Sequence, residues 1–476
     1  MKFRKTLLLF FLIFSAKIFC QQPTLKQCIE IAKQNNIVVK LAEQSLETRQ
    51  ELLQSNQNNY LPKVDFLGGY NYLGEPLKIN LQQVKDGIVE GSANQSVYTA
   101  NSAFQQITGN ELSQQVKDVI YQTSKDIISA FYPNYNPAIA KQSYLLAGVG
   151  IRQPLYLGGK LNASSELASQ QVESGKANLE SSQDFTTYNI VLNYIQVLYL
   201  NSIIDKQQNI VEALQNNEKY AASLLKAEII PPYMKNWADV AKIQGEVNLK
   251  NLNLEKENAL LVLKDLMGIS LNEPLKIDEK LNESNELPIF SLSGNNAELK
   301  FLHSKKKEAE TMHDVTRSLS KPNIFAIGNV QFFRNDLPVI TPPWLVGIEL
   351  QWTLFDPERK SRNLASKSLI KETDILIEQK ERSVNLATKV AENKLVSLKE
   401  QSETFDISRK QTYTSTEMVR KRMENSLSSV KDVNDMLQLQ YEAEKLYYTS
   451  LFTYKTVLAT YFYMIGKTED ITNYIP

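Results

Sequence analysis

The chain repeats one order of motifs in its two halves, and this repeat restricts the possible folds more than any other sequence feature. The segment LYLGGK at residues 155–160 has a counterpart, LFDPER, at residues 354–359, an offset of 199. The last residue of each segment precedes a helix-ending glycine, Gly268 or Gly466, by 108 and 107 residues respectively. Unrelated stretches rarely keep such a spacing, so we infer one duplicated structural unit. A period of about 200 residues predicts two equivalent halves around one axis, not a stack of small repeats.

The composition is typical of long, solvated helices. Glycine and proline are sparse, at 17 and 16 of the 476 residues. Basic and acidic residues are equal in number, 53 each, so the chain lacks the basic excess of a nucleic-acid-binding protein. We therefore expect no nucleic-acid partner.

Residues 1–20 have the pattern of a signal peptide. A basic start, KFRK, precedes an apolar run at residues 7–14 that is too short to span a membrane. Cys20 lies at the expected cleavage site, where it is either an acylated lipoprotein cysteine or is removed with the signal. In the second case Cys28 is left single, and no disulfide can form within the chain.

Four segments change from helical spacing to strict alternation of apolar and polar residues. They lie at about 64–72, 145–151, 324–332 and 344–354, so each half supplies one β-hairpin. Alternation over about ten residues with aromatic ends is the pattern of a transmembrane β-barrel strand, and the edge of a soluble β-sandwich is the alternative. Four strands cannot close a barrel, and lipid does not tolerate open sheet edges. The chain must therefore oligomerise if these strands span a membrane.

The first hairpin contains a long insertion. Pro62 to Leu155 spans 93 residues, whereas Pro322 to Leu354 spans 32, a difference of 61. The insertion lies at about 74–142 and is polar, with a helical pattern near 112–131. Because outer loops of such barrels vary most, we expect an extracellular elaboration.

The remaining segments predict helices of two lengths. Thr24 and Gln27 form a capping-box pattern that opens a helix running to about Asn58. Rods at about 160–225 and 359–423 follow the second strand of each half, and turns at Pro231-Pro232 and Asn425-Ser426 lead into return helices. The first helix and the first return helix, about 35 and 34 residues, together match a rod of about 66. Two short helices laid end to end beside each rod would make a hollow cylinder.

Both rods carry an apolar seam with alternating spacings of three and four, the pattern of coiled-coil packing. The seam residues are Tyr188, Val191, Ile195 and Leu198 in the first rod, and Val384, Ala387, Ala391, Leu395 and Leu398 in the second. We divide the chain into a signal peptide at 1–20, a first repeat at 21–290 and a second repeat at 291–476.

Several segments together resemble the TolC-like outer membrane efflux proteins (outer membrane factors). They are the opening TLKQCIEIA at residues 24–32 with Asn35-Asn36 and Leu61-Pro62, the segment QPLYLGGK at 153–160, and the stretches at 239–244 and 432–440. Their order and spacing cover nearly the whole mature chain. The resemblance implies a fold that is mainly α with a β-barrel portion. Duplicated long coiled-coil hairpins would form an α-barrel, and four strands per chain would complete a twelve-stranded transmembrane barrel in a trimer.

The resemblance also implies a function. A homotrimer in the outer membrane, in contact with its lipid and extending into the periplasm, would be the passive channel-tunnel of a tripartite efflux or type I secretion system. Its partners would be a periplasmic adaptor (membrane fusion) protein and an inner-membrane RND or ABC transporter. The alternative is a non-conducting, outer-membrane-anchored coiled-coil structural protein.

The sequence carries little that suggests catalysis. His303 and His313 are ten residues apart, which on a helix separates them by about 15 Å along the axis, so they are not a metal-binding pair. The glycines at 158–159 lack the residues of a phosphate-binding loop. We expect no enzyme activity, no cofactor and no metal.

Asp432 and Asp435 are the candidate functional residues. They lie three residues apart on one face of the last long helix, near its start. Helix capping and compensation of the helix dipole would explain them without any function. The resemblance instead implies that they line the pore constriction, where six carboxylates of a trimer would attract cations. The first repeat has Met234 and Trp237 at the matching positions, so these rings would come from one half only.

Overall fold

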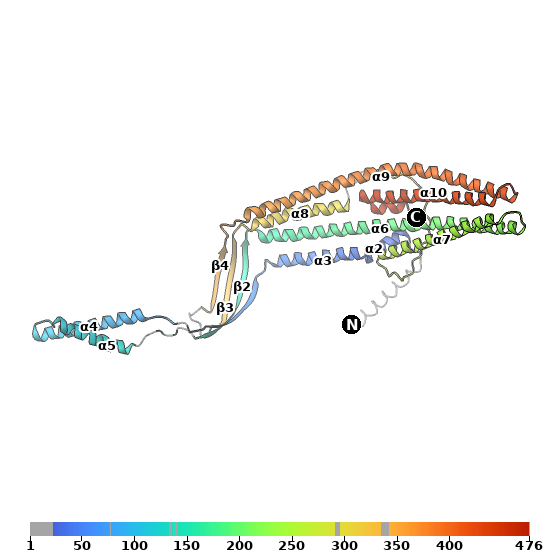
Figure 1. The fold of residues 1–476 in the computed structure, drawn as a ribbon. Helices are drawn as coiled ribbons and strands as arrows, with labels where there is room; N and C mark the ends of the chain where they lie inside the picture. The colour runs from blue at the N-terminus through green and yellow to red at the C-terminus, as the bar shows by residue number, and fades with distance from the viewer. Residues whose placement is uncertain are drawn as a thin grey trace, which may run out of the picture. The chain divides into compact units, whose positions relative to one another are not determined.

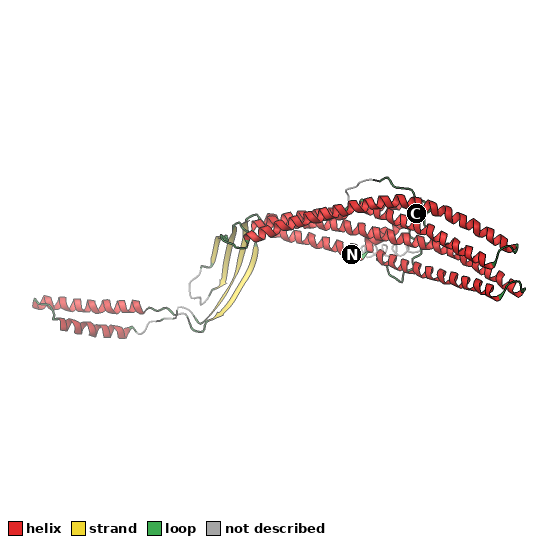
Figure 2. Ribbon diagram, turned by 45° about the horizontal axis from the view of Figure 1, so that its top comes forward, coloured by secondary structure: helices red, strands yellow, loops and turns green. Residues whose placement is uncertain are grey.

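The computed structural model describes residues 22–76, 78–132, 136, 138, 141–290, 296–334 and 342–475. The expected signal peptide and Cys20 lie outside these residues. The described chain is mostly helical with one four-stranded antiparallel sheet, which confirms the expected fold class (Figures 1 and 2). It forms two compact units. One is helical and comprises the residues up to Gln57, Lys160–Leu319 and those from Pro357 onward; the other comprises Asn58–Gly159 and Ser320–Asp356. Each unit takes segments from both predicted repeats, and the division at residue 290 stays a prediction.

The helical unit contains the two predicted rods and the short helices that pack along them. The rod α6 contacts α2, α7, α8 and α10, and the rod α9 contacts α8 and α10. Figure 1 shows α3 and α7 along one line, with α2 beside the place where they meet, and α8 and α10 along another line. Two short helices thus lie end to end beside the rods as expected, except that α2 packs next to α7 instead of extending the line. None of the helices that the structure describes is both long and apolar enough to cross a membrane. The elements of this unit are α2 Leu25–Asn35, α3 Ile37–Asn58, α6 Lys160–Lys226, α7 Pro232–Met267, α8 Ala297–Ser318, α9 Arg359–Glu424, α10 Val430–Met464 and the short 3₁₀ helix η1 Thr468–Asn473.

The predicted capping box at the start of α2 is present. The Thr24 hydroxyl accepts from the Gln27 backbone N–H at 3.4 Å, and the Gln27 side chain accepts from the Thr24 N–H at 3.0 Å. The sequence predicted one uninterrupted helix to Asn58, and this was wrong at one residue. The chain leaves helical geometry at Asn36, whose ψ is 133°, and α3 begins directly afterwards.

Asn36 forms the joint between α3 and the end of α7. Its side-chain oxygen accepts from the backbone N–H groups of Val38 and Val39, at 2.8 and 3.4 Å, and so caps α3. Its side-chain nitrogen donates to the carbonyl of Leu266, 2.7 Å away, in the last turn of α7. Gly268 then ends α7 with φ +66°, and a Cβ there would lie 2.3 Å from the Asn35 carbonyl oxygen. Only glycine suits this position, because the backbone is left-handed and the space is filled.

Asn296 makes the equivalent joint in the second half. Its oxygen accepts from the N–H groups of Glu298 and Leu299, both at 3.1 Å, at the start of α8. Its nitrogen donates to the carbonyls of Tyr463 and Met464, at 3.4 and 3.2 Å, at the end of α10. Gly466 lies just beyond with φ +71°. Both asparagines are almost fully buried, so one side chain per joint satisfies backbone groups of two helices at once.

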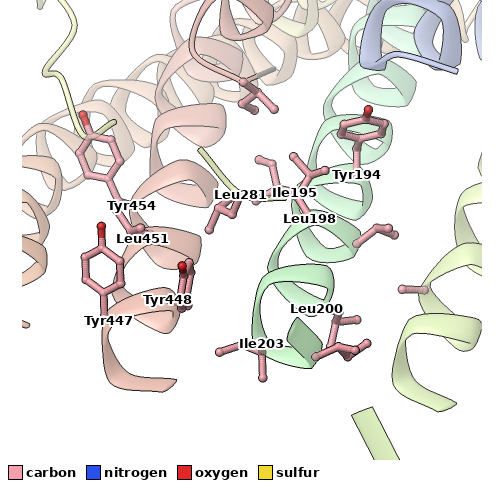
Figure 3. Close-up of a cluster of buried hydrophobic side chains, with 14 of the residues drawn as sticks. Tyr194, Ile195, Leu198, Leu200, Ile203, Leu281, Tyr447, Tyr448, Leu451 and Tyr454 are labelled. Carbon is pink, nitrogen blue, oxygen red and sulfur yellow. The ribbon is translucent and has the colours of Figure 1, made fainter. Parts of the chain in front are cut away.

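The core of this unit lies between α6 and α10. Tyr194, Ile195 and Leu198 on α6 are fully buried, as are Leu451 and Tyr454 on α10 (Figure 3). Most of the two predicted seams is buried: Val191, Ile195 and Leu198 in the first rod, and Val384, Ala391 and Leu395 in the second. The other predicted seam residues, Tyr188, Ala387 and Leu398, are half-buried.

The extended segment after α7 is fixed across this core. Asn201 on α6 donates to the carbonyls of Ile277 and Glu279, at 2.9 and 2.7 Å, and the Tyr448 hydroxyl on α10 donates to Glu283 at 3.0 Å. Leu281 inserts between the two helices (Figure 3). The segment thus bonds both helices and helps to hold them together.

The sheet of the second unit has the strand order β1-β2-β3-β4, with every pair antiparallel. Its strands are β1 Lys63–Tyr72, β2 Ser143–Leu157, β3 Asn323–Phe333 and β4 Trp344–Gln351, which confirms the four predicted strands. Within the described part of the chain, β1 pairs only with β2 and β4 pairs only with β3. Both outer edges are therefore open.

The two faces of the sheet differ in polarity. Residues directly opposite in the ladders share a face, and one face is apolar and exposed across all four strands. It carries Val64, Phe66, Tyr70, Tyr72, Leu145, Ile151, Val330, Trp344, Val346, Ile348 and Leu350. On the other face Arg152 pairs with Glu349 at 3.4 Å and stacks on the Phe325 ring, 3.9 Å from its centroid.

The insertion between β1 and β2 is a helical hairpin of α4 Gln82–Thr108 and α5 Gln114–Phe131. One backbone hydrogen bond of 2.8 Å, from Leu73 to Gln142, extends the pairing of β1 with β2 toward it, and an isolated bridge pairs Lys78 with Ala138. The sequence predicted α5 but missed α4. The two glycines and the many Asn, Gln and Ser residues of α4 obscured its apolar period.

The joints predict a specific loss of stability. Asn36→Ala or Asn296→Ala should each lower the free energy of unfolding by about 1–3 kcal/mol, because a cap is lost and buried carbonyls lose their donor. Asn56→Ala is the matched control, since Asn56 is only half-buried and its side chain donates to the Leu52 carbonyl, 2.9 Å away within α3. The measurement is denaturant unfolding followed by far-UV circular dichroism. Joint variants as stable as the control would show that the asparagines do not hold the helix ends together.

Candidate functional site

The candidate site lies at the turns of the two helical hairpins. Residues 227–231 join α6 to α7, and residues 425–429 join α9 to α10, so the two turns have equal length. Each contains one non-glycine residue in the left-handed region, Glu228 or Ser426, both with φ 59°. Pro232 is the first residue of α7, where proline costs no hydrogen bond. The predicted turns are confirmed, and the chain reverses direction in the same way in both halves, with a five-residue turn that contains one left-handed residue.

Asp432 lies in the first turn of α10 and takes part in its capping. Its carboxylate accepts from the backbone N–H of Ser429 at 2.7 Å, and the Ser429 hydroxyl accepts from the Asp432 N–H at 3.1 Å. The hydrogen bond from the Ser429 backbone lowers the pKa of Asp432 below its ordinary value, because it favours the charged form. Helix capping is therefore one role that Asp432 has, whatever else it does.

Asp435 lies one turn further on and is paired differently. Its carboxylate accepts from Lys431 at 2.8 Å, and this bond raises the pKa of Lys431. The Lys431 ammonium lies 5.0 Å from the centre of the Trp237 ring on α7. The matching position of the first repeat thus supplies an aromatic surface beside the Asp435 pair. Asp432 and Asp435 are both exposed.

A groove of roughly 640 Å³ lies beside this pair and is lined by residues of α6, α7 and α10. The exposed rim of the groove carries Trp237, Val240, Gln244, Asp435 and Gln438, and its floor carries Ile210, Leu214, Ala241 and Tyr441. Gln207 closes one end by donating to the Gly245 carbonyl at 2.8 Å. The groove thus has mostly apolar walls and one carboxylate, that of Asp435, at its rim.

Buried polar contacts fix the start of α10 against α6. Asn217 on α6 donates to the Val430 carbonyl at 3.1 Å and to the side-chain oxygen of Asn434. Both asparagines are buried. Sequence reasoning missed this pair, although asparagine at otherwise apolar seam positions is a readable signal of a contact that sets register.

A regular apolar face runs along α7. Tyr233, Val240, Val247, Leu254 and Leu261 recur every seven residues and are 60%, 54%, 51%, 49% and 40% exposed. A strict seven-residue repeat is the spacing of a coiled-coil contact line. The described chain leaves this line uncovered, and sequence reasoning missed it although the spacing could have revealed it.

A second set of exposed apolar side chains lies on α9. Six of the ten exposed large apolar side chains on α9, namely Leu369, Leu376, Leu386, Val390, Ile407 and Met418, fit the two contact positions of one heptad register. The rods therefore carry seams to their own neighbours and further apolar positions that face outward.

The described residues contain no group of three or more His, Cys, Asp or Glu side chains that could hold a metal ion. His303 and His313 both lie on α8, and the imidazole of His313 is 2.7 Å from the Ser366 hydroxyl on α9.

The sequence matches no protein-family model and no curated protein. The structure matches solved structures over nearly its whole length. The Campylobacter jejuni CmeC outer membrane channel has a TM-score of 0.69 at 13% identity, covering 93% of this chain and 86% of that one. The protein has the fold of an outer membrane channel. The Vibrio cholerae outer membrane protein VceC (TM-score 0.68, 11% identity, 93% and 96% covered) agrees. So does the open-state Neisseria gonorrhoeae MtrE outer membrane channel (0.68, 15%, 94% and 89%).

These matches confirm, at the level of the fold, the resemblance that the sequence motifs carry. The identities are too low to transfer residue roles, and function must be argued from this chain's own residues.

Proposed function

We propose that the protein is the outer membrane channel-tunnel of an export machine, a passive duct built from three copies of the chain. The open four-stranded sheet carries this proposal. Its apolar face is exposed on every strand, and both edges are unpaired in the described chain. Such a sheet is stable in lipid only as part of a closed barrel. Three copies of four strands give twelve.

The helical unit supports the same assembly. The heptad face on α7 and the outward apolar positions on α9 would each leave a row of large side chains in water in a single copy. In a ring of copies, α7 of one chain lies beside α9 of the next and both rows are covered. The intrachain seams and these outward rows together would form a closed helical tunnel.

The duct would lie in the outer membrane and extend into the periplasm. A periplasmic adaptor (membrane fusion) protein and an energised inner-membrane RND or ABC transporter would engage it at the turns of residues 227–231 and 425–429. This is the arrangement of a tripartite efflux or type I secretion system. A passive duct needs no catalytic group, and selection of the cargo would belong to the transporter.

Asp432 and Asp435 are proposed to line the constriction of the duct. Two observations support this proposal: both carboxylates are exposed, and both lie within two turns of the start of α10, beside the end of the hairpin. Three copies would bring six carboxylates together. In this proposal the capping bond of Asp432 adds a second task, because it holds that carboxylate in one orientation.

The first test is assembly and conductance of the purified protein. Mass measurement in mild detergent should give three chains, and the same sample should conduct in a planar bilayer. A stable monomer that keeps its β-structure would refute the barrel. A correctly assembled trimer that stays silent would refute the duct and favour a non-conducting, membrane-anchored coiled-coil protein.

The second test concerns the constriction. The double variant Asp432→Asn/Asp435→Asn should lower cation preference and weaken block by multivalent cations, because six charges leave the narrowest region. Asparagine is preferred to alanine, since it keeps an oxygen that accepts from Ser429. The matched control is Asp314→Asn/Glu378→Gln, which removes two exposed carboxylate charges paired within α8 and α9. A trimeric Asn variant that is blocked like the parent would leave Asp432 with capping alone.

A further inference from the structure

The inserted hairpin of α4 and α5 is too small to bury its own apolar side chains. Only Val89 and Ala93 of α4 are buried, and α5 has no buried residue along its 18 positions. The buried and half-buried positions of α4 mark its contact line with α5, and most of them are small or polar residues, among them Ser92, Ala93 and Ala100. Isolated helices of this length are marginal in water without a packed face. The hairpin therefore needs a further surface against it.

That surface has a defined position. On α5, Val116, Val119 and Ile127 are 43%, 64% and 54% exposed and lie one residue before the contact positions 117, 120 and 128. On α4, Val84 and Ile88, 57% and 44% exposed, lie one residue before contact positions 85 and 89. In two antiparallel helices, the same step from the contact line leads to the same side of the pair. These five residues form one apolar face of the hairpin.

The opposite side of α5 is polar. Asp118 and Gln122 lie there, and both are exposed. Helix α5 is thus two-sided, with one face suited to water and one to a dry contact. This contrast supplies matched controls on the same helix.

The position of the insertion in the sheet says what covers the face. The hairpin continues the ladder of β1 and β2, through the Leu73 to Gln142 bond and the Lys78 to Ala138 bridge. β1 is an edge strand, and in the proposed barrel its free edge would meet β4 of the next copy. The hairpin of each chain would then rise from a boundary between subunits. Three hairpins tethered around one barrel mouth meet at high effective concentration.

We propose that the apolar faces of three α4–α5 hairpins pack against one another, forming a six-helix cap over the outer end of the barrel. The apolar face of each hairpin would be covered by the corresponding faces of the hairpins in the other two copies. This inference rests on the proposed trimer and assigns the insertion a role that the duct alone does not require. The cap would place a helical bundle in the path of anything that leaves or enters the barrel.

Single cysteines test the cap in the full-length protein. Val116→Cys, Val119→Cys and Ile127→Cys, oxidised by air in mild detergent, should shift to a two-chain band on a non-reducing gel. Asp118→Cys and Gln122→Cys should not, because a disulfide needs Cβ atoms within about 4.5 Å. Cys28 stays out of the reaction, since it is fully buried and burial raises its pKa to about 12. Adding Ile127→Asp should abolish the two-chain band of Val116→Cys.

The outcomes separate this inference from the proposed function. Mass measurement of each variant shows whether three chains are present. A trimer that gives no two-chain band, or equal bands from apolar and polar positions, would overturn the cap and leave the duct standing. If the cysteines at the apolar positions resist thiol labelling in outer membranes but give no two-chain band in the detergent trimer, the face is covered by something other than the same face of another copy, and the cap is overturned. A monomer would remove both proposals.

Discussion

Two unpaired sheet edges are the constraint on which this account depends. A backbone N–H or C=O without a partner costs several kcal/mol in hydrocarbon, where no water can replace it. The four strands of this chain satisfy only their inner ladders, and they turn a continuous apolar face outward. In the proposed membrane-spanning form, one copy alone would therefore leave both edges of the sheet unpaired. The helical unit also favours association with other copies. Its reason is different, since the exposed heptad face of α7 gains free energy when its apolar side chains are buried.

The two asparagine joints explain how pairs of short helices can lie end to end along each long rod. A hollow layer of helices needs each long rod to be matched along its whole length, and short helices can do so only if their ends meet. Each meeting exposes the first N–H groups of one helix and the last carbonyls of another. Asn36 and Asn296 satisfy both sets with one side chain, and Gly268 and Gly466 turn the chain away. The repeat first seen as a spacing between motifs is thus a repeat of helix ends.

Much of the fold could be predicted because its signals are local. Alternating residues marked all four strands, and the rods, their seams and the Thr24 capping box followed from helical spacing and cap chemistry. The break at Asn36 could not be read, since asparagine inside a helical pattern signals a joint only when its partner, 230 residues away, is known. Helix α4 was hidden by glycine and polar residues that a tertiary contact tolerates. Of the site, the capping of Asp432 was foreseen as an alternative reading. The Lys431 and Trp237 neighbours of Asp435 were not, because they depend on how α7 meets α10.

Closure of the sheet by other copies can be measured directly with cysteine pairs on the two edge strands. In one chain β1 and β4 are three strand spacings apart, about 14 Å, which no disulfide can span. Cysteines at Phe66 or Tyr70 of β1, each combined with one at Val346 or Ile348 of β4, sample the possible registers. The account predicts that at least one combination oxidises to a covalent three-chain ring. A folded protein that stays single-chain in every combination would contradict it.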